Sequence, residues 1–289
     1  MKKILQVGPV ASGKQQSFGG MQAYMEGLLD TNLSSRYHVF LLNTSVPPIY
    51  KKIRLLRPFL TLVFLSKLVY YLLLERPDIA HIHMTEGLNG RGNIEKRLFA
   101  CLCRWANTKI VLHLHGATLN DFYRNNTAYF SRMLNSSDRN IVLARSWQKL
   151  FSATVEVAKI NVIPNAIWFS DYDYSARDSK ELPVKILFIG AVGKRKGLSD
   201  LGEAISLLGN NIRQKIHLDI VGPEEFNGEL KEMTLLFLKL GVSNISTFHG
   251  PVFGDAKMEF YKRSDIFILP SRNESFGIVN LEAMSASLP

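Results

Sequence analysis

The apolar positions of this chain follow two alternating patterns. Short runs rich in Val, Ile, Leu and Phe are separated by longer stretches with helical spacing, an order that predicts parallel sheets built from strand–helix–strand units. In the first half we expect strands at Ile4–Val7, His38–Leu42, Ile79–His83, Lys109–His113, Asn140–Leu143 and Asn161–Ile163, and helices at Gly20–Leu29, Pro58–Leu74, Asn93–Trp105 and Thr127–Leu134.

The second half restarts the same alternation after a polar stretch that has no apolar period. We expect strands at Val184–Ile189, Ile216–Val221, Ile245–Phe248 and Asp265–Leu269, and helices at Leu198–Leu208, Glu229–Leu240, Asp255–Arg263 and from about Gly277. The chain is therefore predicted to be of the α/β class, with two doubly wound domains facing a cleft, 1–167 and 184–289, joined by a linker, 168–183. Ligands of such domains bind outside the carboxyl ends of the strands, so the loops there hold the candidate sites.

Composition describes an ordinary globular protein in a reducing compartment. The 289 residues suffice for two domains with cores, and 46% are hydrophobic. Cys101 and Cys103 lie two apart in an apolar helical run, where we expect them to be reduced core residues. Two lysines lead directly into the first strand-like run instead of a long apolar segment, so we expect no signal peptide and a cytoplasmic protein.

Positive charge is concentrated in the first half. Residues 1–170 hold 21 Lys+Arg against 9 Asp+Glu, and residues 171–289 hold 14 against 16, so balances of +12 and −2 sum to the +10 of the whole chain. The first half is thus expected to meet an anionic partner, such as phospholipid or a phosphorylated acceptor. A nucleic-acid partner is not expected, because no nucleic-acid recognition motif accompanies the charge.

The segment 49–75 combines basic and apolar residues. Lys51, Lys52, Arg54 and Arg57 precede Pro58, and the following sixteen residues are apolar apart from Thr61, Ser66 and Lys67. This run is shorter than the roughly 20 residues that span a bilayer. A core helix with a basic cap, a helix on the surface of an anionic membrane and a transmembrane span remain open, and the basic first half favours testing the surface helix on the inner face of the cell membrane.

The most specific chemistry lies in the stretch PSRNESFGIVNLEAM near the end of the printed sequence. A polar turn carries Glu274, and a helix that starts near Gly277 carries Glu282. The free backbone N–H groups of Phe276, Gly277 and Ile278 at the start of that helix favour a phosphate. Carboxylates that accept hydroxyl groups beside a phosphate site suggest a nucleotide sugar as the ligand.

This stretch resembles the E-x7-E signature of the retaining family 4 (group 1) glycosyltransferases, including the Pro-Ser turn before it and the Leu-Glu-Ala-Met helix after it. The resemblance implies the GT-B fold of two Rossmann-like domains and sugar transfer from a UDP- or GDP-linked donor to a lipid-linked or polysaccharide acceptor, as in cell-surface glycan synthesis. It also implies that Glu274 is catalytic and holds sugar hydroxyls, and that Glu282 holds the ribose. No cofactor or metal is expected, because fixed cations replace magnesium.

Two further loops of the second half fit this resemblance. Gly190 opens the loop GAVGKRKG, whose glycines allow close approach and whose cations neutralise phosphate charge. The family usually has an arginine directly after the first glycine, where this chain has Ala191; Lys196 matches the family's catalytic lysine, and Arg195 is expected to replace the missing arginine. Gly222 ends the next strand, where the family holds the nucleotide base.

The first half offers weaker candidates. Gly8–Gln15 has the spacing of a phosphate loop up to Lys14, but Gln15 stands where a Ser or Thr hydroxyl should bind magnesium, so an ATPase remains only an alternative. Gly19 and Gly20 precede the first helix, where the family places the donor diphosphate and the acceptor.

Histidines gather on two neighbouring predicted strands of the first half. His115, followed by Gly116, best matches the family's histidine that contacts the transferred sugar, and is our third catalytic candidate. His81, His83, His113 and His115 could also suggest a metal site. We do not predict one, because no carboxylate or cysteine lies at ligand spacing.

The sequence ends at Pro289, where family members continue, so the resemblance predicts a C-terminally truncated chain whose second sheet lacks a strand, with low stability and uncertain activity. A non-catalytic remnant that binds nucleotide sugars is therefore the second function class to weigh. Asp171-Tyr172-Asp173 has the form of a metal-binding D-x-D motif, but we interpret it as a solvated turn of the linker. A glycosidase is disfavoured, because hydrolysis does not require a cationic diphosphate loop.

Overall fold

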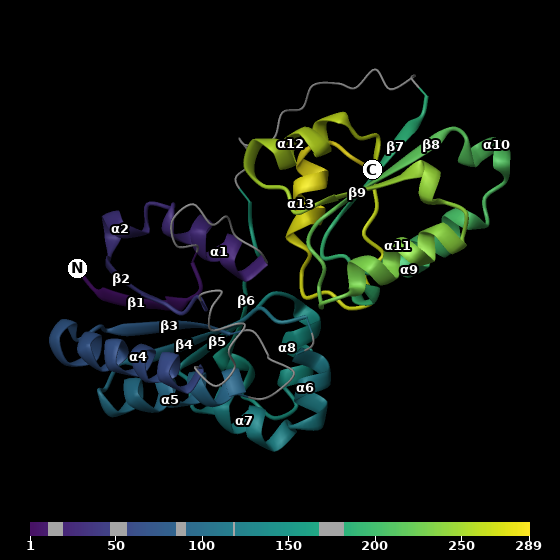
Figure 1. Ribbon diagram of the computed structural model, residues 1–289. Helices are drawn as coiled ribbons and strands as arrows, with labels where there is room; N and C mark the ends of the chain where they lie inside the picture. The colour runs from purple at the N-terminus through teal and green to yellow at the C-terminus, as the bar shows by residue number, and fades with distance from the viewer. Residues whose placement is uncertain (11–19, 47–56, 85–90, 118, 168–181) are drawn as a thin grey trace. The chain divides into compact units, whose positions relative to one another are not determined.

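The computed structural model describes residues 1–10, 20–46, 57–84, 91–117, 119–167 and 182–289 (Figure 1). The chain divides into an N-terminal unit, Met1–Asn165, and a C-terminal unit, Ala166–Pro289. Almost all of the predicted linker, including Asp171-Tyr172-Asp173, lies outside the described residues, as do Lys14, Gly19 and residues 47–56.

The described strands of the N-terminal unit form one parallel sheet of six strands in the order β2-β1-β3-β4-β5-β6. Its strands are β1 (Lys3–Gly8), β2 (His38–Asn43), β3 (Ile79–Met84), β4 (Lys109–Leu114), β5 (Arg139–Val142) and β6 (Ile160–Val162). Each predicted strand of this half is present, and the central ones are buried along almost their whole length. Burial on both faces explains their continuous apolar runs.

Helices cover both faces of this sheet, with α1 on one face and α4 and α5 on the other (Figure 1). The helical segments of the unit are α1 (Gly20–Leu29), α2 (Leu33–Arg36), α4 (Arg57–Tyr70), η2 (Tyr71–Glu75), α5 (Arg91–Trp105), α6 (Leu119–Asn125), α7 (Thr127–Asn135), α8 (Arg145–Phe151) and η3 (Val157–Lys159). The short helices α2, α6 and α8 are additional to the predicted ones, because they are too short to show a clear apolar period.

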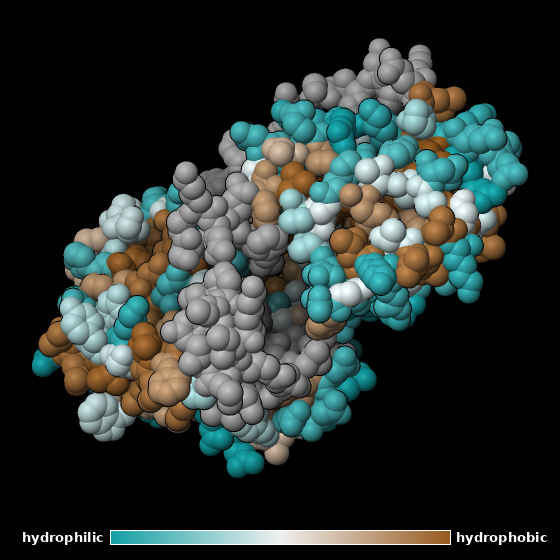
Figure 2. All heavy atoms as spheres, viewed as in Figure 1, coloured by the Kyte–Doolittle hydropathy of each residue, from teal (hydrophilic) through white to brown (hydrophobic). Residues whose placement is uncertain are grey.

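The helix α4 and the turn η2 have one apolar face in the core and another that is exposed. Phe64, Leu68 and Leu72 are buried, whereas Phe59 and Leu62 are 63% and 61% exposed. Within the described residues, Pro58–Glu75 is the one helix long and apolar enough to cross a membrane, with 18 residues, a mean hydropathy of 1.5 and 17% of it buried. Figure 2 shows the hydrophobic residues gathered over α4.

The described strands of the C-terminal unit form a parallel sheet of four strands in the order β10-β7-β8-β9. These are β7 (Val184–Ile189), β8 (Ile216–Val221), β9 (Ser246–Gly250) and β10 (Ile266–Phe267). All are at predicted places, although β10 is shorter than the predicted Asp265–Leu269.

Two apolar clusters on opposite faces of this sheet make the C-terminal unit doubly wound. One packs α9 (Leu198–Ser206) and α11 (Glu229–Lys239) on the sheet, and the other packs α12 (Gly254–Arg263) and α13 (Ile278–Ser285). The remaining turns are η5 (Lys194–Lys196), α10 (Asn210–Arg213) and η6 (Ser243–Ile245). Both units therefore have the predicted α/β architecture.

Candidate functional site

The loops that follow β7 and β8 lie against each other at the carboxyl end of the C-terminal sheet. Gly190 donates its N–H to the carbonyl of Val221 at 3.0 Å, and Val192 donates to that of Pro223 at 2.7 Å. Gly222 has φ +149°, and a Cβ atom there would lie 1.9 Å from the carbonyl oxygen of Gly190. Glycine is required at this position because the two backbones touch.

A second close approach brings the loop after β7 to the turn that precedes α13. Gly197, at φ +73°, ends η5, and its Cβ would lie 1.8 Å from the carbonyl oxygen of Pro270. Next to it, the N–H of Arg272 donates to the carbonyl of Arg195 at 2.9 Å. The cationic turn Lys194–Lys196 is thereby fixed against the polar turn that carries Glu274.

Lys196 and Glu274, which are 78 residues apart in sequence, form an ion pair at this contact. Their side chains are 14% and 23% exposed, so both are largely removed from water but open on one side. Glu274 also accepts a hydrogen bond from the N–H of Ser275 at 3.1 Å. The structure thus brings together two of the residues that the sequence predicted to share one site.

Arg195, the predicted substitute for the missing arginine, has protein partners of its own. It donates from Nε to Glu225 Oε1 at 2.5 Å and from a terminal nitrogen to the carbonyl of Asn273 at 3.1 Å. Arg195 therefore joins the turn before α13 to the loop after β8. Glu225 was not identified from the sequence, because an acid in a polar loop gives no signal of such a partner.

Gly277 precedes α13 at φ +69°, which glycine adopts without strain, and the helix begins at Ile278. A Cβ at Gly277 would lie 3.3 Å from Cγ of Glu274. The first backbone N–H groups of a helix have no partner within it and carry a partial positive charge. The helix therefore starts beside the Lys196–Glu274 pair.

Glu282 lies on α13 and is only 8% exposed. Its carboxylate accepts a hydrogen bond from the Tyr261 hydroxyl at 2.7 Å and pairs with Lys257 Nζ at 2.5 Å. A buried carboxylate needs such partners, because an unpaired charge in the interior is very costly. Lys257 and Tyr261 were not singled out from the sequence, although their spacing of four on one helix places them on one face.

Gly20 and His115 are the candidates that the structure describes in the N-terminal unit. Gly20 is the exposed first residue of α1. His115 follows β4, is 6% exposed, and lies with its Nε2 3.1 Å from His83 Nδ1. Burial and the neighbouring His81 lower the pKa of His115 to about 3, so its imidazole is neutral at physiological pH.

Comparison with known proteins gives a consistent result over most of the chain. Residues 28–168 match the family Glycosyltransferase Family 4, and residues 175–289 match Glycosyl transferases group 1. Among curated relatives, the chain is 36% identical over 104 residues to the uncharacterized glycosyltransferase MJ1607 of Methanocaldococcus jannaschii. It is 31% identical over 111 residues to a D-inositol 3-phosphate glycosyltransferase of Geodermatophilus obscurus. The alignments span 36% and 37% of this chain but only 25% of each relative.

Solved structures match the whole chain at low sequence identity. The Anabaena Alr3699/HepE protein in complex with UDP and glucose has a TM-score of 0.72 at 19% identity, with 100% of this chain and 80% of that chain covered. Sucrose-phosphate synthase from Thermosynechococcus elongatus has a TM-score of 0.75 at 15% identity, with the same two coverages. At these identities the similarity concerns the fold.

Proposed function

Because the chain belongs to the group 1 glycosyltransferases and has their GT-B fold, we propose that it moves a sugar from a nucleoside-diphosphate sugar to a lipid-linked or polysaccharide acceptor with retention of configuration. One observation supports this most. Lys196, Glu274 and the start of α13 converge at the carboxyl end of the C-terminal sheet, although the lysine and the glutamate are 78 residues apart. This arrangement offers a cation and N–H groups to a diphosphate beside a carboxylate for sugar hydroxyls.

In the proposed complex the diphosphate lies between Lys196 and the N-terminal amides of α13, and Glu274 accepts hydrogen bonds from the transferred sugar. Lys196 then exchanges part of its contact with Glu274 for phosphate oxygens. Glu282 accepts from the ribose hydroxyls, because a carboxylate has lone-pair sites beyond those that Tyr261 and Lys257 occupy. In this complex the nucleotide lies against the backbone at Gly190 and Gly222, and Arg195 stabilises the loops around it.

The proposed chemistry is a departure of the diphosphate with attack by the acceptor hydroxyl on the same face of the sugar. The acceptor oxygen forms a bond to the anomeric carbon while the bond to the leaving phosphate breaks, and the acceptor's proton passes to that phosphate. Lys196 and the helix amides stabilise the developing charge, and one such contact typically contributes about 3 kcal/mol. By family analogy His115 contacts the transferred sugar. We propose that this step requires no metal.

The exposed apolar face of α4 supports the further proposal that the enzyme acts at the cytoplasmic surface of an anionic membrane, in cell-surface glycan synthesis. Phe59, Leu62 and Leu74 are each more than 60% exposed, and Lys67 is exposed on the same helix. Leucines can enter the interface while lysines contact headgroups. Cosedimentation at low salt should favour vesicles with anionic lipid, and Leu62→Ser should weaken it. Equal cosedimentation with neutral and with anionic vesicles would overturn the proposal.

The donor proposal is tested by thermal shift with UDP and GDP sugars, followed by product analysis. We expect stabilisation by one nucleotide class that Glu282→Gln reduces and the matched exposed variant Glu259→Gln leaves unchanged. Anomeric analysis by NMR then distinguishes retention from inversion. Binding without transfer to any acceptor would support a nucleotide-sugar-binding remnant, and stabilisation by ATP that depends on Lys14 would support the phosphate-loop alternative.

A further inference from the structure

Four histidines form a compact cluster in the N-terminal unit, on the face of the sheet that α1 covers. His81 and His83 lie two residues apart on β3, and His113 is the register partner of His83 on β4. The three side chains therefore point to the same face of the sheet. His115 follows on the same side. Tyr24 of α1 packs its ring 4.9 Å from that of His113, which places the cluster between helix and sheet.

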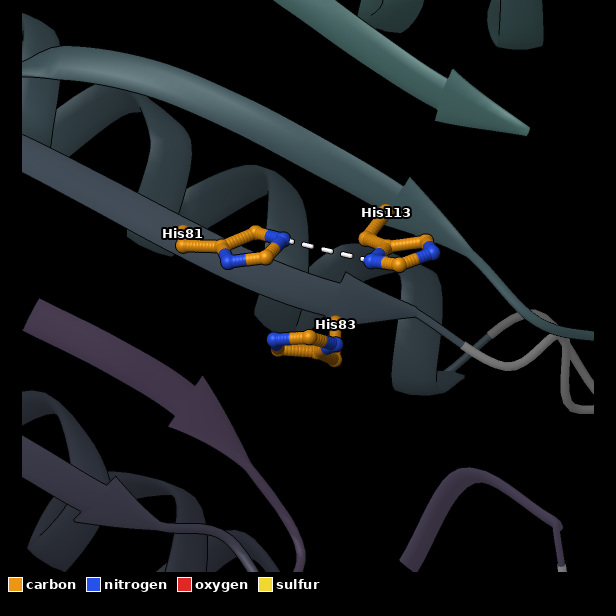
Figure 3. Close-up of side chains that lie close together, drawn as sticks. All are labelled: His81, His83 and His113. Carbon is orange, nitrogen blue, oxygen red and sulfur yellow. Dashed lines mark hydrogen bonds between the residues drawn. The ribbon is translucent and has the colours of Figure 1, made fainter. Parts of the chain in front are cut away.

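Three of these imidazoles are arranged as a set of ligands. One ring nitrogen from each of His81, His83 and His113 lies within 4.8 Å of the others (Figure 3). His81 Nε2 and His113 Nδ1 are 3.3 Å apart. Tetrahedral coordination with metal–nitrogen bonds of 2.0–2.1 Å requires a nitrogen–nitrogen separation of about 3.3 Å. The closest pair thus already has the separation of two ligands of one ion.

The surroundings of the cluster hold it in a form ready to bind. Gln6 Oε1 lies 3.1 Å from His83 Nε2, so the amide oxygen accepts the ring N–H and leaves the lone pair on His83 Nδ1. This nitrogen lies 3.1 Å from His115 Nε2, and an ion bound to it replaces that contact. His113 is 0% exposed, and its Nδ1 is the ring nitrogen that faces His81, so the ligand atoms of this pair are already turned toward each other (Figure 3).

The donor set defines the class of ion. Neutral imidazole nitrogens suit Zn²⁺, Co²⁺, Ni²⁺ and Cu²⁺, whereas Ca²⁺ and Mg²⁺ require oxygen ligands. The side chain of Lys96, which lies near the cluster, is paired with Glu95 at 3.7 Å. The sequence placed these histidines on neighbouring strands, but only the register of β3 and β4 brings one ring nitrogen of each within reach of one ion.

We propose that His81, His83 and His113 bind one divalent transition-metal ion of the Zn²⁺ type, with Gln6 as a positioning residue that fixes the ring of His83. The site joins β3 to β4 near the carboxyl ends of these strands. The three ligands are not among the residues assigned to the proposed sugar transfer, although His115, which is, lies 3.1 Å from His83.

Titration of the metal-free full chain with Co²⁺ alone tests the site, because tetrahedral Co²⁺ has intense visible absorption bands. We expect saturation at one ion per chain and displacement by Zn²⁺. His81→Ala should weaken binding by at least about tenfold and Gln6→Ala by about 10- to 100-fold. His38→Ala, which removes an exposed histidine from β2, should bind as the parent chain does.

Far-UV circular dichroism of each variant shows whether the fold is retained. His81 is the half-buried member of the set, so His81→Ala is the variant expected to remain folded, and His81→Gln provides a second, less disruptive substitution. Absence of saturable binding in the parent chain would overturn the proposal. Binding that survives in both folded His81 variants, or that is lost in His38→Ala, would overturn it equally.

Discussion

Acid should destabilise the N-terminal unit well before ordinary carboxylates are protonated, because three buried histidines and the half-buried His81 are neutral there. Burial lowers the pKa of His81 to about 4 from its ordinary value of 6.5. Burial, together with neighbouring histidines, also lowers the pKa values of His83, His113 and His115. The unfolded chain binds these protons more readily than the folded chain does, so protonation favours unfolding.

The sign and size of this loss of stability follow from the pKa of each histidine in the folded and in the unfolded chain. Above pH 6.5 both states are neutral and the histidines impose no cost. As the pH falls from 6.5 towards about 4, unfolded His81 takes up a proton that the folded form refuses. At about pH 5 this difference lowers the free energy of unfolding by about 2 kcal/mol for His81 alone, and the other three histidines act in the same direction.

Urea unfolding of the metal-free chain at about pH 7.5 and about pH 5 measures this loss. Tryptophan fluorescence is suitable, because Trp105 and Trp147, the tryptophans that the structure describes, both belong to the N-terminal unit. His81→Gln should remove about 2 kcal/mol of the pH dependence, whereas His38→Gln should leave it as in the parent chain. A free energy of unfolding that is equal at both pH values would refute the assignment of buried neutral histidines.

Two substitutions test the packing of the C-terminal unit. Gly222→Ala should lower stability by more than about 2 kcal/mol in thermal or urea unfolding, because its Cβ would meet the carbonyl oxygen of Gly190 at 1.9 Å. Gly190→Ala should lower stability less, because its Cβ would meet only side-chain atoms, of which the nearest is Leu269 Cδ1 at 3.4 Å. The reverse order of the two losses would contradict the loop contact. Tyr261→Phe should lower the free energy of unfolding by about 1.5–3 kcal/mol, because it removes a hydrogen bond to the charged Glu282. An unchanged free energy of unfolding would show that Lys257 alone satisfies this carboxylate.

Periodicity predicted the sheets well because buried parallel strands are continuous apolar runs. The strands from Lys3–Gly8 to Ile216–Val221 lie within a residue or two of their expected bounds. The four-residue helices α2 and α10 were not predicted, since one helical turn has no period to detect. Strand β10 is shorter than expected, because the apolar run continues beyond the residues that pair with β7.

The residues of the candidate site could be proposed from the sequence, but their contacts could not. The flanking pattern around Glu274 and Glu282 identified both acids, and the glycine-rich loop identified Lys196. That Lys196 contacts Glu274 depends on the close approach of Gly197 to Pro270, which only folding creates. Glu225 contacts Arg195 through the pairing of two separate loops, about which the local sequence carries no information. The histidines were expected on neighbouring strands, but the distances between their ring nitrogens depend on the register of those strands.

Nucleotide affinity tests the central claim most directly, because binding of the diphosphate is assigned to one lysine of a cationic turn. Isothermal titration with UDP and GDP should compare the parent chain with Lys196→Met, with the double variant Lys196→Met/Glu274→Gln, which leaves no uncompensated acid, and with Lys194→Met. Lys194 is the matched control, since it is 58% exposed and pairs with Glu232 at 2.6 Å. We predict a loss of about 10- to 100-fold in both Lys196 variants and none in Lys194→Met. Equal affinity in all four proteins would contradict the assignment.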